Sequence, residues 1–97
     1  MYLAMLTTNP EKLFLREQAR AEHDDYWAGR MERIRLAGPL LSDDGNTRLG
    51  QILVLDASDR QTAADLVMND PFVARGLFSD VRIERFRMSV KDGVLQS

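Results

Sequence analysis

The order of apolar and polar residues predicts a strand followed by a long helix in the first third of the chain. Residues 1–6 are apolar or aromatic throughout, and the polar stretch "TTNP" after them can start a helix. Asn9 supplies a capping side chain, and Pro10 suits the first turn because an amide hydrogen would stay unpaired there. From Glu11 to Arg33 apolar residues recur at the spacing of an amphipathic helix. The residues on this face are Leu13, Ala19, Trp27, Met31 and Ile34.

The stretch "IRLAGPLL" predicts a second strand, which a hairpin joins to a third. The acidic, glycine-containing segment "SDDGNT" has turn composition and separates this strand from "RLGQILVLDA". Side chains alternate between the two faces of a strand, which predicts one shared face for several apolar or small residues. These residues are Ile34, Leu36, Gly38 and Leu40.

A second helix and a last strand complete the pattern. Ser58 followed by Gln61 matches a capping box, so the helix should begin there and end around Met68 or Asn69. Its inward face comprises Ala63, Leu66 and Val67. In the last strand Val81 and Ile83 share a face, whereas Phe86, Met88 and Val90 have the opposite parity. This change predicts a bulge near Glu84 and Arg85, and the tail after about residue 91 is expected to be frayed.

The element order predicts a single α+β domain over residues 1–97. Strand, helix, strand, strand, helix, strand is the order of a ferredoxin-like βαββαβ sandwich, with a four-stranded antiparallel sheet and two helices on one face. Both parities of residues 1–6 are apolar, as are Leu53 and Val54, so the helix-free sheet face also collects apolar residues. Such a face needs a cover, and two sheets packed across a two-fold axis provide it. We therefore expect a homodimer through the helix-free sheet face.

Composition excludes several classes of protein. With 13 basic and 15 acidic residues the formal net charge is -2, so no general field favours nucleic acid as a partner. The absence of cysteine excludes disulfides and thiolate chemistry, and leaves a cytoplasmic location as the default expectation. The apolar start of the chain is too short to span a membrane. The single histidine among scattered acids has no metal-ligand spacing, and neither a metal nor any other cofactor is expected.

His23 is the candidate for chemistry. It lies one helical turn from Ala19 and from Trp27, inside the apolar arc of the first predicted helix. Arg16 and Arg20 lie on or beside the same arc, which predicts a cation-lined cleft between this helix and the sheet. The structural alternative is a half-buried histidine held by a backbone carbonyl, with the arginine heads extended to water.

Asp70 also has two interpretations. Asp followed by Pro71 is an ordinary start for a short helix, in which the carboxylate caps free amides. The same residue follows the second helix and returns toward the sheet beside the first helix, so its carboxylate can reach His23. A carboxylate bonded to an imidazole fixes its tautomer, as a proton shuttle near neutral pH requires.

Four segments resemble the YciI-like family, also called YCII-related proteins. They are "RAEH" (Arg20 to His23), "LAGPL" (Leu36 to Leu40), "DPFVARGLF" (Asp70 to Phe78) and the final strand "VRIERF". The resemblance implies a dimeric ferredoxin-like α/β barrel with a His–Asp active site at His23 and Asp70. The chain departs from the common family pattern at Arg85, where a proline often stands, and in the acidic residues after His23. The candidate substrate-binding residues are Arg16, Arg20, Trp27, Gly38, Pro39 and Phe72.

The family looks related to muconolactone isomerase, and one branch includes a dehydrochlorinase of chlorinated hydroxyhydroquinones. We therefore expect a cofactor-independent isomerase or lyase that acts on a small anionic or phenolic molecule. His23 would be the general base or acid, Asp70 its orienting partner, and Arg16 or Arg20 the group that neutralises the substrate. A binding or sensor module for a small metabolite is the alternative, and a cofactor-free monooxygenase is a third.

Overall fold

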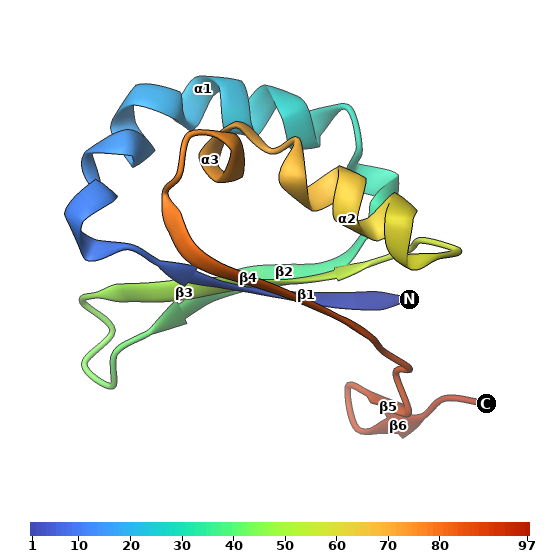
Figure 1. Cartoon of the computed structure of the whole chain (residues 1–97). Helices are drawn as coiled ribbons and strands as arrows, with labels where there is room; N and C mark the ends of the chain where they lie inside the picture. Colours follow the sequence, from blue (N-terminus) through green and yellow to red (C-terminus); the bar gives the residue numbers. More distant parts are fainter.

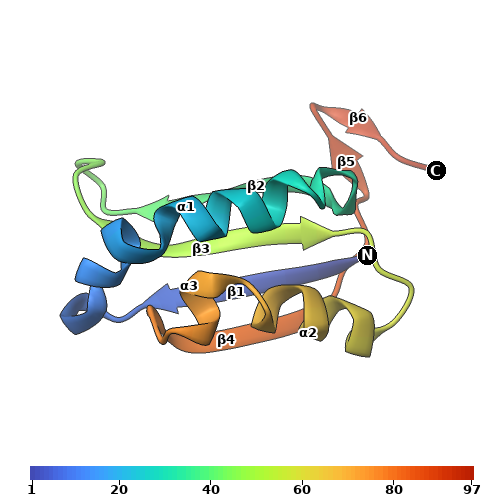
Figure 2. The ribbon, with the colours of Figure 1, turned by 90° about the horizontal axis from the view of Figure 1, so that it is seen from above.

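The computed structural model describes all 97 residues and shows one antiparallel sheet with its helices on a single face (Figure 1). The four strands lie in the order β2-β3-β1-β4, which is the ferredoxin-like order and confirms the predicted fold class. The elements are β1 (Tyr2–Thr8), α1 (Phe14–Ala28), β2 (Ile34–Leu41), β3 (Arg48–Leu55), α2 (Arg60–Met68), α3 (Pro71–Ala74) and β4 (Phe78–Arg85). Seen from above, α1 lies over β2 and β3, whereas α2 and α3 lie over β1 and β4 (Figure 2).

The first predicted helix is shorter than expected. Asn9 accepts a hydrogen bond from the amide of Glu11 at 3.0 Å, but it caps a short 3-10 turn, after which α1 begins at Phe14. The helix ends at Ala28 with Gly29 as its C-cap, and a 3-10 turn at Met31–Arg33 leads into β2. Its buried residues are Leu15, Ala19 and Trp27, and the predicted Leu13 and Met31 are 43% and 59% exposed. The predicted apolar face was therefore right at its centre and wrong at both ends.

The predicted common face of β2 is wrong at its first residue. The register between β2 and β3 shifts between Ile34 and Leu36, which pair with Leu55 and Val54. Paired residues of an antiparallel sheet share a face, so Ile34 lies with buried Leu55 on the helix side. The irregularity at Arg35 reverses the parity of the strand. Beyond it Leu36, Gly38 and Leu40 face away from the helices, and Ala37 and Pro39 face toward them.

Two boundaries of the second half also differ from the expectation. Asp59, not Ser58, caps α2, because its carboxylate accepts from the amide of Thr62 at 2.7 Å. The predicted bulge near Glu84 and Arg85 is absent, since both residues keep regular pairing with β1. The chain instead leaves the sheet after Arg85, which accounts for the change of parity without a bulge. The only shift in this strand pair lies at its other end, between Thr7 and Thr8.

The tail expected to be frayed forms a short hairpin. Its strands are β5 (Val90–Lys91) and β6 (Val94–Leu95), and they pair antiparallel around a two-residue turn. The turn residues Asp92 and Gly93 both have positive φ, at 51° and 75°, as a tight hairpin turn with the twist of its strands requires. The hairpin stands on the side of the sheet away from the helices (Figure 1).

Two buried clusters hold the helices on the sheet. The larger one joins Trp27 of α1 and Val67 of α2 to residues of β1 and β3. The smaller one joins α1 to α3 and the residue before β4, and consists of Leu15, Ala19, Phe72 and Leu77. The inward residues Ala63 and Val67 predicted for α2 are buried, at 0% and 1% exposure.

The stability of α2 should depend on Asp59 and not on Ser58. The Thr62 amide that donates to Asp59 lowers the pKa of this carboxyl below its ordinary value of 3.8. The cap contributes fully to the free energy of unfolding when the carboxyl is ionised in both the folded and the unfolded state, well above pH 3.8. Its contribution is lost as the pH falls through the lowered pKa of the folded state. Asp59→Ala should lower the melting temperature at pH 7, and this difference should shrink on acidification. Ser58→Ala is the matched control, and an equal effect of both variants at pH 7 would contradict the assignment.

Candidate active site

A cavity of about 290 Å³ lies between α1 and the sheet. Its lining residues come from α1 on one side, from β1, β2, β3 and β4 on the other, and from Asp70 and α3 at one edge. Figure 2 shows how these elements are arranged. Apolar side chains form about half of the lining, as in many small-molecule sites. The polar lining consists of Arg16, Arg20, His23, Asp24, Arg48, Gln51 and Asp70.

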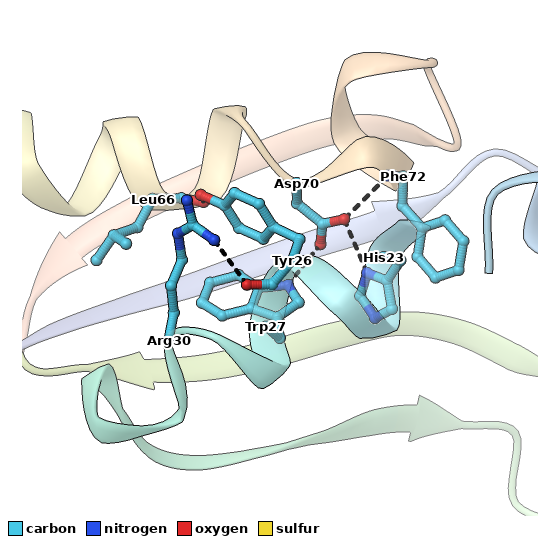
Figure 3. A network of polar contacts seen from close by, with 7 residues as sticks. All are labelled: His23, Tyr26, Trp27, Arg30, Leu66, Asp70 and Phe72. Carbon is cyan, nitrogen blue, oxygen red and sulfur yellow. Dashed lines mark hydrogen bonds and ion pairs between the residues drawn. The ribbon is translucent and has the colours of Figure 1, made fainter. Parts of the chain in front are cut away.

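His23 and Asp70 meet at the inner wall of this cavity. The Nδ1 atom of His23 lies 2.7 Å from Oδ1 of Asp70 (Figure 3). Asp70 stands between α2 and α3 and is only 4% exposed. Its Oδ1 also accepts from the amide of Phe72 at 2.9 Å, and its Oδ2 accepts from the indole nitrogen of Trp27 at 3.0 Å. Asp70 therefore caps α3 and contacts His23 at the same time, so its two interpretations are compatible.

This set of contacts determines the tautomer of His23. The amide of Phe72 and the indole of Trp27 can only donate, so the carboxylate of Asp70 acts as an acceptor. The ring nitrogen that faces it, Nδ1, must then carry a hydrogen. In Figure 3 the other ring nitrogen, Nε2, points away from Asp70. When the imidazole is neutral, Nε2 carries the free lone pair. His23 is one of the residues that line the cavity.

Stacking and hydrogen bonds restrict the rings around this pair. The His23 ring stacks on Phe72, with centroids 3.9 Å apart and an angle of 15° between the planes. The Tyr26 hydroxyl donates to the carbonyl of Leu66 at 2.7 Å, which ties α1 to α2 (Figure 3). Burial, supported by the nearby charge of Asp70, raises the pKa of Tyr26, although Arg30 acts in the opposite direction. The phenol therefore stays a hydrogen-bond donor at neutral pH.

The cavity has an excess of unpaired positive charge. Arg16, Arg20 and Arg48 line it, and no carboxylate lies within ion-pair distance of any of them. Burial lowers the pKa of Arg16, and repulsion from Arg48 and then Arg20 adds to the effect. Arginine nevertheless stays protonated in proteins. The site therefore presents a positive field to a ligand that enters it.

The structure brings together all but one of the predicted site residues. His23, Asp70, Arg16, Arg20, Trp27, Pro39 and Phe72 all line the cavity. Gly38, predicted as a substrate contact, does not, because the irregularity at Arg35 places it on the helix-free face. The partner of His23 is a carboxylate rather than the backbone carbonyl of the structural alternative.

Three polar residues of the lining were not predicted. Gln51 interrupts an apolar strand at a position that shares its parity with Leu53 and Leu55, and this signal could have identified it. Arg48 follows a polar turn, where an arginine is ordinarily exposed to solvent. Asp24 is one of several acidic residues after His23 and had no distinguishing spacing. Asp24 and Arg48 line the cavity only because α1 packs over the hairpin of β2 and β3.

Two further findings concern metals and membranes. No group of three or more His, Cys, Asp or Glu side chains lies close enough together to hold a metal ion. None of the helices combines the length and apolar character that crossing a bilayer requires.

The fold and the site define a ferredoxin-like α+β domain with a His–Asp pair in a cation-lined cavity. The chain belongs to the family of the YCII-related domain, whose sequence profile matches residues 1–87. Among curated proteins, none matches the chain significantly.

Solved structures resemble the chain over most of its length. One is the 5-chloro-2-hydroxyhydroquinone dehydrochlorinase from Burkholderia phenoliruptrix AC1100, in complex with 2,5-dihydroxybenzoquinone. It is 28% identical, covers 89% of this chain and 92% of its own, and superimposes with a TM-score of 0.77. Another is the protein At3g17210 from Arabidopsis thaliana, at 10% identity, 89% and 91% coverage and a TM-score of 0.46.

Asn at position 70 cannot satisfy all of the donors that surround the carboxylate. Its oxygen could still accept from Phe72 and His23, but its NH2 group would then face the indole N–H of Trp27. Asp70→Asn should therefore lower the free energy of unfolding by about 1–3 kcal/mol. Trp27→Phe removes the opposing N–H, so the Asn substitution should cost less in that background.

A double-mutant cycle in urea measures this coupling between positions 27 and 70. The expected interaction energy is about 0.5–3 kcal/mol, in the range for side chains in direct contact. If Asp70→Asn costs the same with Trp and with Phe at position 27, the indole hydrogen bond contributes nothing to stability.

Proposed function

We propose that the chain is a cofactor-independent enzyme that transfers a proton on a small phenolic or anionic substrate, as an isomerase or as a lyase of the dehydrochlorinase type. The contact between His23 Nδ1 and Asp70 Oδ1, at 2.7 Å, carries the proposal. It gives a neutral imidazole the tautomer whose free nitrogen, Nε2, can accept a proton. Asp70 is the positioning residue that stabilises the imidazolium formed when His23 accepts that proton.

The proposed reaction balances without an oxidant or a reductant. His23 Nε2 removes the proton of a ring hydroxyl and returns it to a neighbouring ring carbon, which gives the keto tautomer. An isomerisation ends at this step. If that carbon carries a halide, solvent water takes the proton of a second hydroxyl and the halide leaves with its electron pair. The net change is loss of the hydrogen halide, and the histidine is regenerated.

The similarity to a dehydrochlorinase of known structure supports this class of reaction. That protein acts on a chlorinated hydroxyhydroquinone and is in complex with a dihydroxybenzoquinone, a single-ring compound. The cavity of about 290 Å³ lies near the lower end of the range for ligand sites, a size that suits a single-ring substrate. Arg20, three residues before His23 on α1, would stabilise the phenolate or enolate that forms when the hydroxyl proton leaves.

A substrate screen tests the proposed proton transfer. Chlorinated and unchlorinated hydroxyhydroquinones and lactones of aromatic-ring cleavage should be incubated with the protein, while chloride release and ultraviolet spectra are followed. On any compound that is converted, His23→Ala should lower kcat by about 10²–10⁴-fold, the usual contribution of a general base. Its circular dichroism should be unchanged.

Gln18→Ala on the exposed face of α1 is the matched control and should keep full activity. Unchanged turnover in His23→Ala would reject the assigned base. Compounds that bind tightly but are all recovered unchanged would instead favour the alternative function, a metabolite-binding or sensor module.

We further propose that the protein is a homodimer through the helix-free face of its sheet. The register directs Leu3 and Met5, not Tyr2 and Ala4, toward this face. The apolar residues of the face are Leu3, Met5, Leu36, Leu40, Ile52 and Val54. Leu36 and Leu40 are each 45% exposed in a single chain, and a second sheet packed against them would remove this area from water. The cytoplasmic location expected from the sequence stays a prediction.

Leu36→Glu should dissociate the proposed dimer. An unpaired carboxylate in an apolar interface costs several kcal/mol, so the dissociation constant should rise by about 100-fold or more. Sedimentation velocity across micromolar concentrations measures the effect. Met68→Glu is the matched control, because Met68 is 51% exposed but lies on α2, on the opposite side of the sheet. A wild-type protein that sediments as a monomer would overturn the proposal.

A further inference from the structure

Arg16 and Arg48 lie at one end of the cavity, on opposite walls. Arg16 belongs to the first turn of α1, and Arg48 is the first residue of β3. Both line the cavity, and α1 and β3 begin at the same end of the sheet (Figure 2). Arg48 was not among the residues that the sequence singled out.

This pair of arginines lies some distance along α1 from the His–Asp pair. Arg16 and His23 are seven residues apart, which places their Cα atoms about 10 Å apart along the helix. Phe72 lies between the two groups, because its ring stacks on His23 at 3.9 Å and lies 5.3 Å from the guanidinium carbon of Arg16. A small ring held beside Phe72 can therefore contact His23 at one end and the arginines at the other.

The two arginines at this end of the cavity form no ion pair within the protein. The four ion pairs of the chain are His23–Asp70, Arg35–Asp56, Arg75–Glu22 and Arg82–Glu84. None of them contains Arg16 or Arg48. Burial and then repulsion from Arg48 lower the pKa of Arg16, and the opposing effects of Glu17 and Asp24 are smaller. Like charges held together in this way are stabilised by an anion that binds between them.

We infer that Arg16 and Arg48 form a carboxylate-binding subsite, and that the substrate of the proposed enzyme carries a carboxylate at the end opposite the hydroxyl that His23 deprotonates. The inference rests on the proposed function and names its substrate class. A guanidinium group matches a planar carboxylate with two parallel hydrogen bonds, so either arginine can bind both oxygens while the other adds its positive charge. Arg16 is half-buried and packs near Phe72, which favours a carboxylate over a strongly hydrated phosphate. The substrate would then differ from the chlorinated hydroxyhydroquinone after which the similar dehydrochlorinase is named, because that compound has no carboxylate.

Binding of unreactive probes tests this subsite independently of catalysis. Trp27 is the only tryptophan of the chain and lines the cavity, so its fluorescence reports on ligands. The probes are 4-hydroxybenzoate, its neutral counterpart 4-hydroxybenzyl alcohol, and 4-hydroxyphenyl phosphate. We expect 4-hydroxybenzoate to bind at least about tenfold more tightly than the alcohol, as charge-assisted hydrogen bonds predict.

Arg48→Gln should remove this preference. It should weaken 4-hydroxybenzoate binding by about 10- to 100-fold and leave the affinity for the alcohol unchanged. Arg87→Gln is the matched control, since it removes the same charge from an exposed loop residue outside the cavity. His23→Ala should keep the preference for the carboxylate, because the subsite lies apart from the base.

Three outcomes would overturn the inference. They are equal affinity of the wild-type protein for the acid and the alcohol, equal effects of the Arg48 and Arg87 variants, and tighter Arg48-dependent binding of the phosphate. None of these results would affect the role proposed for His23, which the turnover of its alanine variant tests separately.

Discussion

The buried carboxylate of Asp70 is the constraint on which the site and the helix layer depend. It accepts hydrogen bonds from the indole of Trp27, the amide of Phe72 and the imidazole of His23. Two of these donors belong to α1 and one to α3, so the carboxylate fixes the position of one helix against the other. A buried charge that loses such partners costs several kcal/mol. Any shift of α1 that misplaced His23 would therefore also leave Asp70 or Trp27 without its partner.

This arrangement lets one residue serve folding and positioning together. The amide bond to Oδ1 caps α3 in the manner expected of an Asp–Pro pair, and the same oxygen faces His23 Nδ1. The indole bond uses the other oxygen and belongs to the core. A carboxylate has enough lone pairs for all three donors, whereas an amide does not. Capping alone would permit Asn or Ser at position 70, so the requirement for an acid comes from the two side-chain donors of α1.

Local patterns predicted the features that depend on local physics. The apolar spacing identified α1, α2 and the four sheet strands, and the face of α1 placed His23 inward. The parity reversal at Arg35 could not be predicted, because it depends on how β2 pairs with β3 and not on the composition of either strand. It moved Gly38 out of the site and left Pro39 in it. Arg48 escaped detection for a similar reason, since only the packing of α1 over the hairpin turns an ordinary turn-end arginine into a cavity residue.

The geometry of α1 explains why a core helix can also form one wall of a charged cavity. Arg16, Arg20, His23 and Trp27 follow one another at steps of four, three and four residues, which makes a single stripe along the helix. Leu15 and Ala19 lie one position earlier and form a neighbouring stripe that packs with Phe72 and Leu77. The two stripes lie within one wide inward arc. The hydrogen bond from Trp27 to Asp70 docks the first stripe, and apolar burial docks the second. Leu15 and Trp27 are buried near the two ends of α1. The cations and the imidazole of the polar stripe therefore lie on a helix that packs against the protein at both ends.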